Sequence, residues 1–145
     1  MVLEGDFAGG VRFIETAIQW NELEGSPVGR DYARMSLAET FLEFLAPKQK
    51  SALSVLLKNL PFLIETVLIG RRRALELLMQ ARDNPFWAGA TYFRARIDAD
   101  LGILHKLSKR RAEARSYLMQ ARPVAESLGA TGLLSKIDAA LADLT

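Results

Sequence analysis

The sequence predicts an all-α fold built from antiparallel helix pairs. Apolar residues recur at helical spacing along nearly the whole chain, whereas the two-residue alternation typical of strands is almost absent. Half of the 145 residues are apolar, so the chain is long enough to bury a sizeable core without disulfides. A long segment also recurs within the chain, which indicates an array of similar units.

Turn residues divide the chain into its expected helices. Gly25-Ser26-Pro27 combines a terminating glycine, a capping serine and a first-turn proline, and Asp83-Asn84-Pro85 and Leu128-Gly129 act in the same way. Further breaks follow from Ala46-Pro47 and Asn59-Leu60-Pro61. We expect Pro123 to kink its helix or to split off the last turn. The expected helices span residues 7–24, 28–45, 48–59, 61–69, 71–83, 86–107, 110–128 and 131–144.

The internal repeat is the strongest pattern in the sequence. The string LMQAR occurs at 78–82 and again at 118–122, an offset of 40 residues. At this offset, 15 of the 35 positions in 71–105 are identical to their counterparts. A weaker copy lies 64 residues upstream, where Ala17, Gly25 and Leu37 correspond to Ala81, Gly89 and Leu101. The repeating unit is therefore a helix pair with variable connections.

Large and small residues alternate within this unit in a way that favours close helix packing. Gly102, Ala114 and Ala121 carry almost no side chain, so two antiparallel helices can approach closely while Leu101 and Leu118 fill the remaining space. The small-large-small trio Ala114-Leu118-Ala121 of the second helix has two further copies in the chain. The large-small pair Leu101-Gly102, which His105 follows one turn later, has one further copy. These copies are Gly10-Ile14-Ala17, Ala74-Leu78-Ala81 and Leu37-Ala38-Phe41.

This spacing resembles the tetratricopeptide repeat (TPR), in which helix A is followed by helix B. The resemblance implies a short right-handed superhelix of about 3–4 repeats over a single domain, 1–145. It also implies an N-terminal half repeat and a C-terminal capping helix. The chain departs from the family in its 40-residue period and in the poor match of 46–70.

A narrower resemblance concerns the run that begins DLGILHKLSKRRAEARSYLMQAR, with NLPFLIE and an RRRAL helix upstream. It is similar to the C-terminal repeats of bacterial signalling proteins that couple a class III adenylate or guanylate cyclase domain, or a DNA-binding domain, to a signal-transduction ATPase. The resemblance implies that the chain is the C-terminal fragment of such a cytoplasmic protein. No GxxxxGK[ST] loop and no paired metal-binding aspartates occur here, so no activity carries over.

Composition excludes several kinds of chemistry. The chain has no cysteine and one histidine, His105, which excludes thiol nucleophiles and multi-histidine metal sites. We expect His105 to be a packed structural residue rather than a catalytic group or a ligand. The net charge is only +2, the N-terminus lacks the pattern of a signal peptide, and no apolar run is long enough to span a membrane. We therefore expect no catalytic residues, no metal and no cofactor.

The concave face of such an array is the expected partner-binding surface. It would be formed mainly by A helices and bind a peptide or helix from the same parent protein, or a second copy. By repeat position, the expected residues are Tyr32, Met35, Glu39, Arg96, Ile103 and Lys106.

The first helix offers a second candidate surface, because it carries two apolar stripes. Phe7, Val11, Ile14 and Ile18 form one, and Phe13, Ala17 and Trp20 form the other. Only one stripe has an assigned cover within the chain, and uncovered apolar faces of this size usually bind a partner. A freestanding, self-associating protein is therefore the alternative to a signalling fragment, with Phe7, Phe13 and Trp20 as contacts.

Other clusters favour structural roles over chemistry. The basic runs Arg71-Arg72-Arg73 and Lys109-Arg110-Arg111 would serve a nucleic-acid binder, but they lie at matching turns where solvated residues paired with Glu76 or Glu113 are expected. Asp98 and Asp100, two positions apart on a helix, point to different faces and form no acid–base pair. Three aromatic residues cluster near one connection between helices, and such a cluster more often belongs to a core or an interface than to a cofactor site. They are Trp87, Tyr92 and Phe93.

Overall fold

The structure is a computed structural model that describes residues 6–46, 60–89 and 91–144, in which every regular element is a helix. The predicted all-α class is therefore confirmed for this part of the chain, whereas the expected helix 48–59 lies outside the described residues. The elements are α1 (Phe7–Leu23), α2 (Pro27–Leu45), α4 (Leu60–Arg82), the 3-10 helix η2 (Pro85–Ala88), α5 (Thr91–Leu107), α6 (Arg111–Ser127) and α7 (Thr131–Ala142).

The chain divides into two compact units, Met1–Leu77 and Leu78–Thr145. The first unit contains α1, α2 and most of α4, and the second contains the end of α4, then η2, α5, α6 and α7.

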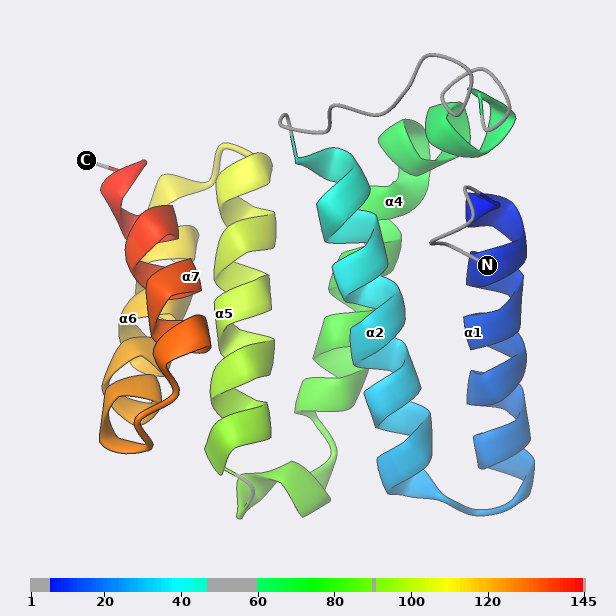
Figure 1. Cartoon of the computed structure of the whole chain (residues 1–145), viewed down its shortest axis with the longest axis horizontal. Helices are drawn as coiled ribbons and strands as arrows, with labels where there is room; N and C mark the ends of the chain where they lie inside the picture. Colours follow the sequence, from blue (N-terminus) through cyan, green and yellow to red (C-terminus); the bar gives the residue numbers. More distant parts are fainter. Residues whose placement is uncertain (1–5, 47–59, 90, 145) are drawn as a thin grey trace. The chain divides into compact units, whose positions relative to one another are not determined.

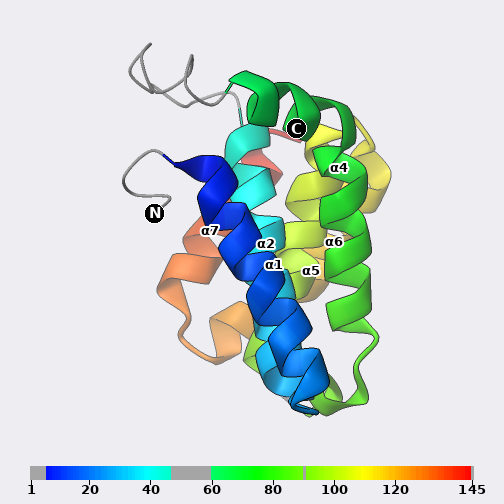
Figure 2. The same ribbon diagram turned by 90° about the vertical axis from the view of Figure 1, so that its right-hand side faces the viewer.

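Helices α1 and α2 form an antiparallel hairpin and lie side by side in both views (Figure 1, Figure 2). Gly25 ends α1 in the left-handed conformation, with φ of 65°, and the Ser26 N–H donates to the Asn21 carbonyl at 2.8 Å. The turn between α6 and α7 repeats this geometry. There Gly129 has φ of 63°, and the Ala130 N–H donates to the Ala125 carbonyl at 2.9 Å. Both glycines act as the terminators that the sequence predicts.

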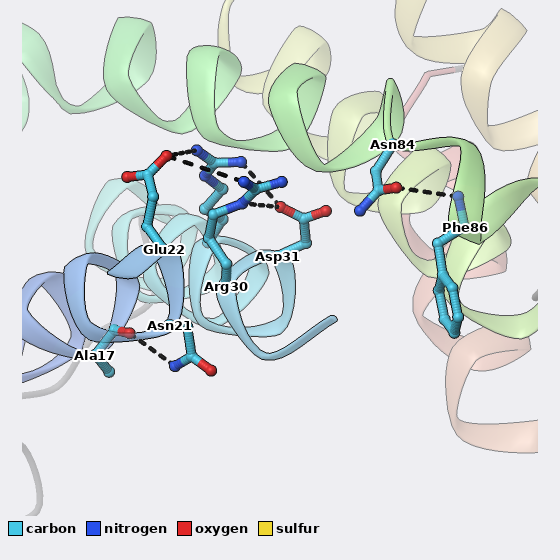
Figure 3. Close-up of polar contacts among 8 residues, drawn as sticks. Ala17, Asn21, Glu22, Arg30, Asp31, Asn84 and Phe86 are labelled. Atoms are coloured by element: carbon cyan, nitrogen blue, oxygen red, sulfur yellow. Dashed lines mark hydrogen bonds and ion pairs between the residues drawn. The ribbon is translucent and has the colours of Figure 1, made fainter. Parts of the chain in front are cut away.

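A polar cluster joins the two helices of this hairpin near their turn. Arg34 Nη1 lies 2.9 Å and Arg30 Nε 3.2 Å from Asp31 Oδ1, and both arginines also reach Glu22 of α1 (Figure 3). The Asp31 side chain is fully buried, so its charge needs such partners. This buried carboxylate was not expected from the sequence.

Helix α4 is continuous through Gly70, so the expected break between 61–69 and 71–83 is wrong. A glycine inside a helix costs only about 1 kcal/mol relative to alanine, which is too little to end a long helix. Within the first unit, Arg73 of this helix forms an ion pair with Glu15 of α1. Its guanidinium carbon also lies 5.8 Å from the centre of the Phe41 ring of α2. Both contacts tie α4 to the α1–α2 hairpin.

The second unit is built around α6, which packs against both α5 and α7. An ideal Cβ placed on Gly102 of α5 would lie 2.6 Å from Leu118 Cγ and 3.1 Å from the Ala114 carbonyl oxygen of α6. The close approach that the sequence predicts for this pair is therefore present. One cluster of buried residues in the unit comprises Ala95, Ala99, Ala114, Leu118, Ala121, Ala125, Leu133, Ile137, Ala140 and Leu144.

The expected helix 86–107 is interrupted, and this prediction is corrected. Residues Pro85–Ala88 form the 3-10 helix η2, and α5 begins at Thr91 after Gly89. The Asn84 side chain caps η2 by accepting from the Phe86 N–H at 3.0 Å (Figure 3). Pro123, in contrast, leaves α6 unsplit up to Ser127.

Candidate functional site

Among the residues of the first unit whose exposure the structure describes, the most exposed aromatic side chains lie on one face of α1. Phe13 is 67% exposed, Trp20 is 63% exposed, and Leu23 at the end of the helix is 85% exposed. Spacings of seven and three residues place these side chains along one line of the helix. We call Phe13, Trp20 and Leu23 the open face of α1. Exposed aromatic side chains spaced in this way provide large anchors for a partner helix.

The opposite side of α1 is held in place by its neighbours. Asp6 caps the helix by accepting from the Gly9 N–H at 2.9 Å. Phe7 and Val11 are buried, and the Phe7 ring centre lies 4.6 Å from that of Phe44 in α2. The Phe7 side chain therefore belongs to the core and is not accessible as a self-association contact. The first predicted stripe is thus buried at Phe7 and Val11 and half-buried at Ile14 and Ile18, whereas the second is exposed at Phe13 and Trp20.

The residues expected on a concave face lie in different surroundings. In the first unit, Tyr32 is exposed and Glu39 is half-buried, but Met35 is fully buried. Met35 shares one side of α2 with the buried Asp31, Ala38 and Leu42, so it contributes to the core rather than to an accessible surface.

In the second unit, Arg96 is half-buried, and Ile103 packs against the core of α5, α6 and α7. Lys106 Nζ lies 2.5 Å from Asp143 Oδ2. Ile103 is therefore engaged in packing, and Lys106 in an ion pair.

The basic runs consist mainly of solvated residues. Arg71 and Arg72 are exposed, and Arg72 Nε lies 3.5 Å from Glu76 Oε1, the partner expected from the sequence. Arg73 differs because it contacts α1 and α2. Lys109, Arg110 and Arg111 are exposed at the turn between α5 and α6, where Lys109 has φ of 60°.

The aspartates of α5 point to different partners, as expected. Asp98 Oδ1 accepts from Arg82 Nε at 2.7 Å, whereas Asp100 Oδ1 accepts from Lys136 of α7 at 2.7 Å. The Arg82–Asp98 pair has a counterpart at the 40-residue offset, because Arg122 Nε donates to Asp138 Oδ1 at 2.8 Å. This recurring ion pair was not expected from the sequence, although its arginine is the last residue of LMQAR in both copies.

The aromatic group near η2 has a buried tryptophan at its centre and exposed rings beside it. Trp87 is fully buried, and its ring centre lies 4.7 Å from that of Phe93. Phe86 and Tyr92 are exposed beside it.

His105 is buried in the α5–α6 contact. Its imidazole lies parallel to the Tyr117 ring of α6, with ring centres 5.4 Å apart. Burial and the positive charge of Arg110 lower the pKa of His105 below its usual value, while Glu113 opposes this shift. The fold therefore favours the neutral form of His105, as expected for a packed structural residue.

Acidification is expected to destabilise the second unit through His105. The unfolded chain takes up a proton near pH 6.5 and the folded chain only at lower pH, so stability is complete above about pH 6.5 and decreases as the pH falls below it. Urea unfolding at several pH values measures this loss. Phe41 occupies the equivalent position in α2, so His105→Phe is a matched variant without a titrating ring. An equal acid dependence in the two proteins would contradict the assignment.

No metal centre or membrane segment is found in the part of the chain that the structure describes. No group of three or more aspartate, glutamate, histidine or cysteine side chains among residues 6–46, 60–89 and 91–144 could hold a metal ion. None of the helices described is long and apolar enough to cross a membrane.

In comparisons with known proteins, the chain matches no family model, no curated protein and no solved structure.

Proposed function

We propose that the chain is a non-catalytic helical-repeat module that binds a helix of a partner protein on the open face of α1. The observation that carries the proposal is the exposure of Phe13 and Trp20, seven residues apart on a helix whose other side is packed. Aromatic side chains contribute most of the energy of many protein interfaces. They are spaced here at two turns, the interval at which a helix presents anchors to another helix.

The arrangement of the repeats is part of the same proposal. We propose a short right-handed TPR-like superhelix, supported by the close α5–α6 approach at Gly102 and by the matching turns at Gly25 and Gly129. The likeness to the C-terminal repeats of cyclase–ATPase signalling proteins supports a cytoplasmic regulatory role in such a protein. The reading frame upstream of Met1 tests this part. An in-frame cyclase or ATPase sequence supports it, and a stop codon with a ribosome-binding site contradicts it.

Replacing both aromatic anchors by glutamate is expected to abolish partner binding without unfolding the chain. Because Phe13 and Trp20 are mostly exposed, the variant Phe13→Glu/Trp20→Glu loses few internal contacts. Two lost anchors weaken an interface roughly tenfold or more. Affinity capture from the native cell, followed by titration calorimetry of each captured protein against the purified chain, measures the loss.

A matched control separates lost anchors from added charge. The variant Met119→Glu/Leu128→Glu also introduces two glutamates at exposed apolar positions, in α6 and at its C-cap. Circular dichroism should show native helix content in both variants. The control should bind like the wild-type chain. Partners that bind equally to all three proteins would contradict the proposed surface.

A further inference from the structure

Five basic residues of the second unit are held in ion pairs with acids of the same unit, at distances of 2.5–3.5 Å. They are Arg82, Arg94, Lys106, Arg122 and Lys136. Four others are exposed and form no ion pair with any residue of the described ranges, including Glu113, the partner expected from the sequence. We call these four the basic turn: Lys109, Arg110, Arg111 and Arg115.

The basic turn concentrates the positive charge of the chain in a short segment. Residues 109–115 contain four basic residues and one acid, a formal charge of +3, whereas the whole chain carries +2 and its remaining residues therefore −1. The segment joins α5 to α6 and forms the beginning of α6 (Figure 1). A cluster of exposed charges of one sign attracts molecules of the opposite sign, so this segment is the place where an anionic partner is favoured.

Lys109 occupies a backbone conformation that glycine adopts at two other helix ends. The φ angles are 65° at Gly25, 63° at Gly129 and 60° at Lys109. At all three turns this residue donates its N–H to the carbonyl three positions earlier, and the next residue donates to the carbonyl five positions earlier. A residue with a Cβ atom is less favourable than glycine in this left-handed conformation. The fold therefore gains nothing from lysine here, and an unfavourable backbone conformation of this kind indicates a role outside the fold.

We propose that the basic turn binds a segment of a partner protein rich in aspartate and glutamate. Three of its four residues are arginines, whose planar guanidinium groups donate two parallel hydrogen bonds to one carboxylate. Because these side chains have no ion-pair partner among the described residues, no internal ion pair is lost when they bind. The inference goes beyond the proposed function, because the basic turn belongs to the second unit and the open face of α1 to the first.

The distribution of charge favours a short acidic segment over a nucleic acid or a membrane. Four cations within seven residues form a compact patch, whereas a long polyanion would continue onto a chain whose remaining residues carry a net −1. The exposed positions of 109–116 carry no aromatic side chain on which a base could stack. They also carry no large apolar side chain that would enter a bilayer.

Fluorescence anisotropy with a labelled octaglutamate peptide tests the inference on the full chain at low salt. The wild-type chain is expected to bind the peptide saturably, and added salt should weaken binding. Arg110→Gln/Arg111→Gln is expected to weaken binding roughly tenfold, because two guanidinium partners are lost. Arg12→Gln/Arg71→Gln is the matched control and should bind like the wild-type chain. It removes the same charge at two exposed positions of the first unit that form no ion pair with a described residue.

Lys109→Gly separates recognition from folding. Glycine adopts the left-handed conformation without strain, so the midpoint of thermal unfolding is expected to rise by about 3 °C. Binding of octaglutamate is expected to weaken roughly threefold, because one exposed charge is lost. A variant that binds the peptide as tightly as the wild-type chain would remove Lys109 from the surface. A variant that is no more stable would contradict the argument from its backbone conformation.

Three outcomes would overturn the inference as a whole. One is the absence of octaglutamate binding at low salt. Another is equal weakening in Arg110→Gln/Arg111→Gln and Arg12→Gln/Arg71→Gln, which would assign binding to the overall charge of the chain. The third is tighter binding of an oligothymidylate of the same charge, or of phosphatidylserine vesicles, which would assign the basic turn to nucleic acid or to a membrane surface.

Discussion

Replacing Gly102 by leucine is expected to destabilise the second unit by about 3 kcal/mol. The first added carbon would lie 2.6 Å from Leu118 Cγ and 2.9 Å from its Cδ2. It would also lie 3.1 Å from the Ala114 carbonyl oxygen, which cannot move without bending α6. Leu118 is fully buried, so its side chain has no open space into which it could rotate. Larger side chains at this position must therefore push α5 and α6 apart.

Urea unfolding followed by circular dichroism measures the change, with Gly132→Leu as the matched control. An added side chain at Gly132 in α7 meets no atom within 4 Å, so the same substitution gains helix propensity there and causes no clash. Combining Gly102→Leu with Leu118→Ala should recover part of the loss, because the second change removes the atoms that clash. Equal stability of Gly102→Leu and Gly132→Leu would show that the two helices are not in close contact.

The α5–α6 pair illustrates what the sequence can predict. The small residues at Gly102, Ala114 and Ala121 were expected to permit close packing, and the distances around Gly102 confirm it. Turn glycines were equally informative, since Gly25 and Gly129 both adopt the left-handed conformation at helix ends. In both cases one residue type satisfies a strict steric requirement, so the sequence pattern has few alternative readings.

Helix boundaries at the other glycines were harder to predict. Gly70 lies within a continuous α4, whereas Gly89 follows η2 just before α5 begins. A glycine alone lowers helix stability only modestly, so neighbouring residues decide whether the helix ends. The repeat contained the missing information, because Gly89 aligns with Gly129, which separates α6 from α7.

The candidate surface was predicted in part. Two apolar stripes on α1 were visible from spacing alone, but spacing does not show which stripe is covered. The structure buries Phe7 and exposes Phe13 and Trp20. Met35 was expected on an open face because its place was inferred from its position in the repeat. Helix α2, however, buries residues on more than one side, and this depends on neighbours that a helical pattern does not specify.

Removing the carboxylate of Asp98 is expected to cost about 2 kcal/mol of folding free energy. Asp98 is 6% exposed and accepts from Arg82 Nε at 2.7 Å, while Arg94 Nε lies 3.5 Å from its other oxygen. Although burial opposes it, the hydrogen bond to Asp98 raises the pKa of Arg82. In Asp98→Ala the Arg82 guanidinium, which lies over the Tyr117 ring at 5.5 Å, would lose its carboxylate partner in a mostly covered site.

The internal repeat supplies the control for this prediction, because Asp138 occupies the equivalent position. Its partner distance to Arg122 is 2.8 Å, nearly the same as in the buried pair, but the two side chains are 47% and 36% exposed. Water and salt screen such a pair, so Asp138→Ala should change stability by no more than the error of a urea titration. The two arginine–aspartate distances are nearly equal, so the comparison measures what the covered position and the second arginine, Arg94, add to the Asp98 site. Similar losses in both would show that the Arg82–Asp98 pair gains nothing from its covered position.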